Sequence, residues 1–219
     1  CWNKKGHGPQ NLATALANSC NPYFVNLGLK MGGDMIKKYA ALLGLTEQNI
    51  IGYPFVDSTH IAFNSKIPGA VANASIGENG ISLSPVQIAG LLSIVANGGY
   101  RVQPRLVKDI EKPDGTVVVA YPAAARERVI RSETAKTIQQ YLVGAVQNGT
   151  ASNAGGDLYV GGKTGTSENK GVWFAGFAPA DEPRWAIVVY VSDGTAGGKE
   201  GAQVFKEISE NMAKLENLL

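Results

Sequence analysis

The sequence predicts an α+β domain: a mainly helical lobe over about residues 10–150, then a small antiparallel sheet with a C-terminal helix over residues 158–219. Three observations predict it. Apolar residues recur at helical spacing through the first part, between breaks at Gly and Pro. Three expected strands, of which the second and third are apolar, then follow one another with connections too short for a crossover helix, which favours antiparallel pairing. Helical spacing returns at the end of the chain.

The helices of the first part are predicted from their start and stop residues. Ser, Asp or Asn before an apolar run indicates an N-cap, Pro fits the first turn, and Gly ends a helix. The expected helices are 11–18, a helix from Pro22 to the Gly32-Gly33 pair, 34–43 capped by Asp34, 85–97 begun by Ser84-Pro85, and 132–147 capped by Ser132. Residues 46–70 show no convincing period and are expected to form a loop with short elements.

The strands are predicted from apolar runs and turns. Residues 105–111 and 116–121 flank a Lys-Pro-Asp-Gly turn, which indicates a β-hairpin or extended arm. Three further strands are expected at 161–167, 172–178 and 185–191. The last is continuously apolar, which is typical of a strand covered on both faces. The final helix places Ala202, Phe205, Ile208, Met212 and Leu215 on one face, which should pack against the sheet.

Composition excludes several classes of function. A formal net charge of +2 gives no electrostatic case for nucleic acid or an anionic membrane surface. No apolar run approaches the ~20 residues that span a bilayer. His7 and His60 have no Asp or Cys at metal-ligand spacing, so we expect no metal and no other cofactor. Cys1 and Cys20 are expected to be unpaired thiols.

Two short motifs carry candidate chemistry. Lys163-Thr164-Gly165-Thr166 opens the first of the three strands and places a cation beside two hydroxyls. Ser19-Cys20-Asn21 lies between two expected helices. Each has a simpler interpretation when taken alone: the first is an ordinary strand end, and Ser19 or Asn21 caps the helix after Pro22.

Together and in this order, the two motifs resemble the K-T-G and S-x-N elements of penicillin-binding proteins. Further stretches resemble the same family: 18–24, 75–80, 84–89, 96–99 and 173–179. The resemblance spans residues 1 to about 193 and is nearest to the class B, monofunctional D,D-transpeptidases. It implies the fold shared by serine β-lactamases and penicillin-binding transpeptidases.

The resemblance also implies an activity, the cross-linking of peptidoglycan stem peptides through a serine acyl-enzyme. The substrate would end in D-Ala-D-Ala, and β-lactam antibiotics would bind as its mimics. Lys163 would supply positive charge, and Thr164 and Thr166 would bind the terminal carboxylate. Gly165 would let the substrate lie along the strand as an added strand. The Thr166 N–H would form the strand half of an oxyanion hole.

The S-x-N motif has implied roles as well, but its usual partner is missing. Ser19 would contact Lys163 and relay protons toward the leaving group, and Asn21 would hold the substrate amide. The family's acylated serine lies in an S-x-x-K motif upstream of S-x-N, yet no serine precedes Ser19 here. The one S-x-x-K match, at 167–170, follows the K-T-G strand directly and is interpreted as coincidence. We therefore expect the C-terminal part of a transpeptidase domain, without the nucleophile helix and the first strands, and inactive alone.

The resemblance further implies a cellular location and partner proteins. The parent would lie on the extracytoplasmic face of the bacterial cell membrane, anchored by an N-terminal helix outside this chain, among cell-wall synthesis proteins. Absent strands would leave an edge of residues 185–191 unpaired and favour self-association. Two alternatives share the fold: the β-lactam sensor of a signalling receptor and a non-catalytic scaffold. A serine β-lactamase is disfavoured, because Cys20 stands where that class has Asp.

Overall fold

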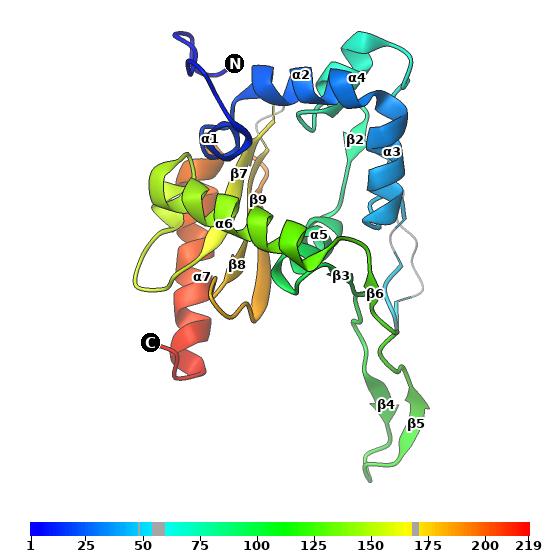
Figure 1. Ribbon diagram of the computed structural model, residues 1–219. Coiled ribbons are helices and arrows are strands. Elements are labelled where there is room, and N and C mark those ends of the chain that lie inside the picture. The colour runs from blue at the N-terminus through cyan, green and yellow to red at the C-terminus, as the bar shows by residue number, and fades with distance from the viewer. Residues whose placement is uncertain (48, 54–59, 168–170) are drawn as a thin grey trace.

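The computed structural model describes residues 1–47, 49–53, 60–167 and 171–219, and Figure 1 shows its arrangement of helices and strands. The helices are α1 (Leu12–Ala17), α2 (Asn21–Met31), α3 (Gly33–Leu42), α4 (Pro68–Ala74), α5 (Pro85–Ala96), α6 (Ser132–Asn148) and α7 (Ala202–Leu215), with short turns η1 (Ser152–Ala154) and η2 (Gly197–Gly201). The strands are β1 (His60–Ile61), β2 (Ile81–Ser82), β3 (Tyr100–Arg101), β4 (Asp109–Glu111), β5 (Val117–Ala120), β6 (Glu127–Arg128), β7 (Gly161–Thr166), β8 (Val172–Ala178) and β9 (Trp185–Val191). The predicted α+β class is confirmed.

The main sheet is antiparallel and has the order β7-β8-β9. Its register pairs Lys163 with Ala175 and Gly165 with Trp173. β8 is the central strand and is almost wholly buried, whereas β7 lies at one edge. The other strands form two-stranded ribbons, β1–β2, β3–β6 and β4–β5.

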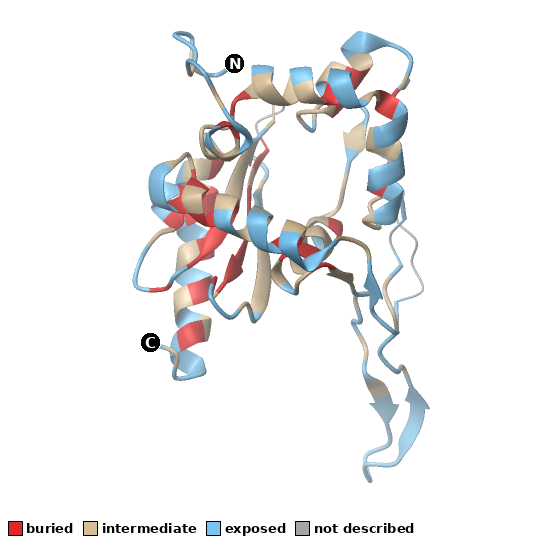
Figure 2. Ribbon diagram, in the orientation of Figure 1, coloured by how far each residue is buried: buried red, intermediate tan, exposed pale blue. Residues whose placement is uncertain are grey.

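Helices cover both faces of this sheet (Figure 1). Side chains on β8 alternate between the faces, as the pleat requires. Phe174 points to α7, where its ring lies 4.6 Å from that of Phe205. Phe177 belongs to the cluster on the other face, with Leu92 of α5 and Leu142 of α6. Figure 2 shows that the buried segments, drawn in red, are concentrated in the sheet and in the helices beside it. Side chains of β9 pack into both clusters, so the prediction that this strand is covered on two faces is confirmed.

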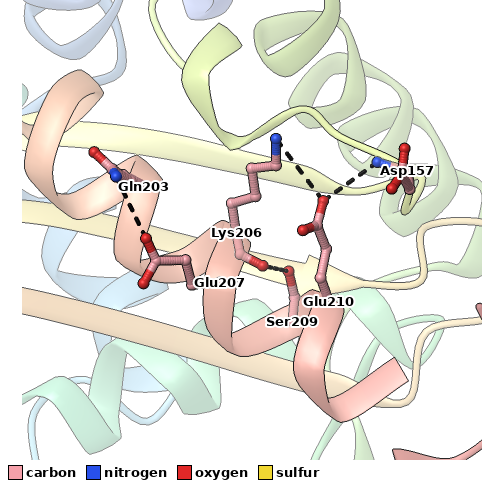
Figure 3. Close-up of polar contacts among 6 residues, drawn as sticks. All are labelled: Asp157, Gln203, Lys206, Glu207, Ser209 and Glu210. Atoms are coloured by element: carbon pink, nitrogen blue, oxygen red, sulfur yellow. Dashed lines mark hydrogen bonds and ion pairs between the residues drawn. The ribbon is translucent and has the colours of Figure 1, made fainter. Parts of the chain in front are cut away.

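The outer side of α7 is polar and is tied to the segment before β7 (Figure 3). The Asp157 N–H donates to Glu210 Oε1 at 3.3 Å, and Lys206 Nζ lies 3.9 Å from the same oxygen. Gln203 donates to Glu207 at 3.3 Å. The inner side buries Ala202, Phe205 and Ala213 against the sheet, so α7 is amphipathic as expected. Ile208 and Leu215, which were predicted to lie on this packed face, are exposed.

The predicted hairpin arm is present as β4–β5 and extends away from the other elements (Figure 1). Its turn is closed by Gly115 N–H donating to the Lys112 carbonyl at 2.9 Å. Asp114 accepts from the Thr116 N–H at 2.9 Å, which is the local contact that Asp supplies in turns. In the part of the chain that the structure describes, no helix has the length and apolar character needed to cross a membrane.

Residues 46–70 were expected to form a loop with short elements; β1 is one such element, and α4 begins at Pro68, whose fixed φ suits the first turn of a helix. Two local predictions were wrong. Gly32, not Asp34, is the N-cap of α3; Asp34 instead forms an ion pair with Lys66 at 2.6 Å. Arg131 is the N-cap of α6, and Ser132 is its first residue. Residues 54–59 lie outside the described residues.

Candidate active site

β7 approaches its neighbours closely because two glycines precede Lys163. A side chain at Gly161 would meet the Phe177 ring at 2.5 Å, and one at Gly162 would meet the Phe174 ring at 2.6 Å. The two rings therefore lie over the start of β7, one on each face. This packing fixes the strand that carries the Lys-Thr-Gly-Thr motif.

Ser19 is held by the end of α1. The Cys20 N–H donates to the Ala15 carbonyl at 2.9 Å and the Ser19 N–H to the Leu16 carbonyl at 3.2 Å, which is the Schellman pattern of helix termination. Ser19 occupies the left-handed position of that motif, with φ of 53°, where Gly is usual. The turn thus places a serine hydroxyl at a position that most helix ends leave without a side chain.

Lys163 and Ser19 meet across the site. Lys163 Nζ donates to Ser19 Oγ at 2.9 Å, to the Thr164 carbonyl at 3.0 Å and to Thr164 Oγ1 at 3.2 Å. Burial lowers the pKa of Lys163 to about 8, because a partly desolvated ammonium is less stable than one in water. With a pKa of about 8, the group is still mainly an ammonium at neutral pH.

Thr166 is positioned by η2. The Gly197 N–H donates to Thr166 Oγ1 at 3.2 Å. Glu200 holds the preceding turn, because its carboxylate accepts from the Thr195 hydroxyl at 2.5 Å and from the Ala196 N–H at 3.0 Å. These hydrogen bonds, the Thr195 hydroxyl foremost, lower the pKa of Glu200 to about 2. Since Thr166 Oγ1 accepts from a backbone amide, its own proton is available to a ligand.

Thr150, which sequence reasoning missed, joins the two motifs. Its N–H donates to the Ala17 carbonyl at 2.9 Å, and its hydroxyl lies 3.1 Å from Thr164 Oγ1. Thr150 follows the Asn148-Gly149 pair that ends α6. A Gly-Thr pair at a helix end carries no local signal for contacts with residues so distant in the chain.

The simpler interpretation of Ser19-Cys20-Asn21, in which Ser19 or Asn21 caps the helix after Pro22, is wrong. Cys20 is the N-cap of α2, and no side chain makes a capping hydrogen bond there. Asn21 is the first residue of α2 and is half-buried; its side chain has no hydrogen-bond partner among the described residues. Cys1 and Cys20 are free thiols. The Ser-x-x-Lys match after β7 ends on Lys170, outside the described residues.

Other parts of the described chain offer less chemistry. The described residues contain no group of three or more His, Cys, Asp or Glu side chains that would hold a metal ion. A separate hollow of about 290 Å³ lies between α3, α5 and the β3–β6 ribbon, beside the ion pair of Arg101 and Glu127. None of the residues that line it belongs to either motif.

Comparison with known proteins agrees with this geometry. Residues 1–210 match the family model described as "Penicillin binding protein transpeptidase domain". The chain belongs to the penicillin-binding protein transpeptidase family. It is 36% identical over 205 residues to stage V sporulation protein D of Bacillus subtilis, covering 88% of this chain and 31% of that protein. It is 32% identical over 199 residues to the peptidoglycan D,D-transpeptidase PbpA of Mycolicibacterium smegmatis, covering 86% and 40%.

Solved penicillin-binding proteins share its fold. The D,D-transpeptidase domain of a peptidoglycan glycosyltransferase from Eggerthella lenta superimposes with a TM-score of 0.85 at 26% identity, covering 96% of this chain and 54% of that one. Penicillin-binding protein 3 of Mycobacterium tuberculosis, complexed with aztreonam, gives 0.84 at 28% identity, covering 95% and 52%. The class B assignment and the transpeptidase fold are therefore confirmed. The chain spans about a third of the length of these two curated relatives and about half of the two solved chains.

Proposed function

We propose that the protein to which this chain belongs is a peptidoglycan D,D-transpeptidase that cross-links stem peptides through a serine acyl-enzyme and binds β-lactams at the same site. The observation that carries the proposal is the contact of Lys163 Nζ with Ser19 Oγ at 2.9 Å, between residues 144 positions apart. It brings both family motifs to one place beside two threonine hydroxyls. Relatives named as D,D-transpeptidases and a relative solved with aztreonam support the same conclusion.

The carboxylate of the substrate would lie against the edge of β7. Lys163 provides positive charge there, and Thr166 has a hydroxyl proton available because Gly197 donates to its oxygen. Residues on a strand alternate in the direction of their N–H groups. The Ser167 N–H points into the sheet, to the Gly171 carbonyl, so the Thr166 N–H faces outward. This amide is our candidate for the strand half of the oxyanion hole, and Gly165 leaves the edge clear for a ligand backbone.

Ser19 would move the proton in acyl transfer. When a serine attacks the D-Ala-D-Ala carbonyl, its O–C bond forms, the C–N bond breaks, and D-Ala leaves after its nitrogen accepts the serine proton. Ser19 Oγ can receive that proton on one side and donate its own on the other, while the Lys163 ammonium beside it stabilises the transient negative charge. Asn21, at the start of α2, is proposed to hold the substrate amide.

The acylated serine is proposed to come from outside these 219 residues. Support comes from the sequence, where the sole Ser-x-x-Lys match directly follows β7 rather than opening an apolar helix. The same proposal places the active protein on the extracytoplasmic face of the cell membrane, where its substrate lies, held by an anchor outside these residues.

Labelled penicillin tests the proposal. The full-length product of the gene should form a covalent adduct, and the Lys163→Met variant should form it at least tenfold more slowly. The 219-residue chain alone should form none. A stable adduct on the chain alone would show that it carries the nucleophile, and no adduct on the full-length protein would reject the site.

A second assay separates the same-fold alternatives. A transpeptidase joins two stem peptides in the presence of an amine acceptor, whereas a sensor acylates without cross-linking. Full-length protein that binds penicillin but joins no stem peptides would favour the sensor. Rapid release of hydrolysed penicillin would favour a β-lactamase.

A further inference from the structure

Thr150 touches both walls of the site and belongs to neither motif. Its backbone N–H and its hydroxyl both face the Ala17 carbonyl, at 2.9 and 3.3 Å, next to the turn that holds Ser19. The same hydroxyl lies 3.1 Å from Thr164 Oγ1 on β7. Thr150 is half-buried, between the end of α6 and η1.

Neighbouring glycines keep Thr150 in this position. A side chain at Gly149 would collide with the Ala17 carbonyl, and one at Gly198 would lie 2.6 Å from the Thr150 carbonyl. Backbone therefore closes on Thr150 from both sides.

Counting protons shows what the hydroxyl can do. A threonine hydroxyl has one proton to donate and two lone pairs to accept with, whereas an ammonium only donates and a carbonyl only accepts. The Thr150 proton has two acceptors within reach, the Ala17 carbonyl at 3.3 Å and Thr164 Oγ1 at 3.1 Å. When Thr150 donates to Ala17, Thr164 can donate to Thr150 Oγ1 while it accepts from Lys163 Nζ. In this arrangement the Thr164 proton is used by Thr150.

A bound carboxylate reverses the direction of the hydrogen bond between Thr150 and Thr164. It accepts only, so Thr164 turns its proton to the ligand, and Thr150 then turns its own proton to Thr164 Oγ1. The Ala17 carbonyl loses the longer hydroxyl contact but keeps the Thr150 N–H, so no buried carbonyl is left without a partner. Thr164 then accepts two donors, Lys163 and Thr150, which polarises its O–H toward the ligand.

We propose that Thr150 is a positioning residue that switches its hydroxyl proton from Ala17 to Thr164 and so directs the Thr164 hydroxyl to the ligand carboxylate. The inference rests on the proposed function, because it needs a carboxylate seat on β7. It adds a residue outside both motifs to the groups that recognise an anionic ligand.

The experiment compares ligands with and without the negative charge. The full-length gene product and its variants are acylated with benzylpenicillin and with the methyl ester of its carboxylate. Thr150→Val keeps the shape and the backbone N–H but removes the hydroxyl, and Thr150→Ser restores a hydroxyl. Thr137→Val is the matched control, since it removes an exposed hydroxyl that donates only along α6, to the Glu133 carbonyl. Thermal melting of each variant checks that it is folded.

The expected result is selective. Thr150→Val should slow acylation by benzylpenicillin about three- to tenfold, because the hydrogen bond from Thr150 to Thr164, which contacts the carboxylate, is lost. The same variant should slow acylation by the ester less than twofold. Thr150→Ser and Thr137→Val should behave as the wild type. Equal slowing with both ligands, or no slowing, overturns the inference while leaving the proposed function intact. Failure of the wild type to be acylated by benzylpenicillin overturns both.

Discussion

Ser19 is a serine in a backbone conformation that suits glycine. Left-handed φ costs a side-chain-bearing residue roughly 1 kcal/mol, and the Schellman turn after α1 imposes it at φ of 53°. The serine whose hydroxyl contacts Lys163 is therefore present although its backbone conformation lowers the stability of the turn. Such conflicts are expected where a residue serves a site rather than the fold.

A pair of substitutions at Ser19 separates strain from chemistry. Ser19→Ala and Ser19→Gly both remove the hydroxyl, but only glycine relieves the backbone. We expect Ser19→Gly to be about 1 kcal/mol more stable than Ser19→Ala by urea unfolding, and both to lose acyl transfer in the full-length protein. Equal stability of the two variants would mean that the turn imposes no strain.

Lys163 predicts a pH dependence of stability. Its pKa is about 8 in the folded chain and about 10.5 unfolded, so between these values the unfolded state binds more protons and stability rises with pH. Below pH 8 both states are protonated and the desolvation penalty is constant. Relative to Lys163→Met, which has no titrating group, the wild type should gain up to about 3 kcal/mol between pH 8 and 10.5. Unfolding free energies of the two proteins across that range provide the measurement, and parallel curves would contradict it.

At the scale of the elements, glycines inside helices have two different functions. Gly28 of α2 faces α4, where an added methyl would lie 2.6 Å from Ser75 Cβ. Gly144 of α6 has no atom within 4 Å of the same position. Gly28 lets α2 and α4 pack closely. Gly144 makes no such contact and only lowers the helix propensity of α6.

Alanine at these two positions should therefore have opposite effects. Gly28→Ala should destabilise the chain by about 2 kcal/mol, because α2 and α4 must separate or Ser75 must move. Gly144→Ala should stabilise it by about 0.5–1 kcal/mol through helix propensity. Thermal melting of both variants measures the difference. A stabilised Gly28→Ala would show that α4 yields easily.

Elements with strong periodicity were predictable from the sequence, and elements set by distant contacts were not. The strands β7–β9 and the Ser84-Pro85 start of α5 were predicted, and Ser84 and Gln87 form the capping box there. α4 was missed because Pro68 marks a loop and a helix start equally well. In the site, the two motifs were recognisable, but Thr150 and η2 act through bonds to β7 that no local pattern records.

At the scale of the molecule, both outer strands of the sheet, β7 and β9, have a single partner strand among the described residues, and only β7 carries the candidate site. Within the described ranges β9 pairs with β8 alone, and an open strand edge is a template for association. We expect the 219-residue chain to sediment as a concentration-dependent species larger than its 23.0 kDa, with slow amide exchange along β9. A monomer whose outward β9 amides exchange freely would contradict this expectation.

The bond between Lys163 and Ser19 also bears on how the chain folds. It closes a loop of 144 residues, and the Thr150–Ala17 contact closes one of 133. Contacts of such separation carry a large loop-closure entropy and form only once both ends of the chain are ordered. The contact between Lys163 and Ser19 is then a late event in folding: a substitution anywhere that slows the approach of α1 to β7 would delay completion of the candidate site.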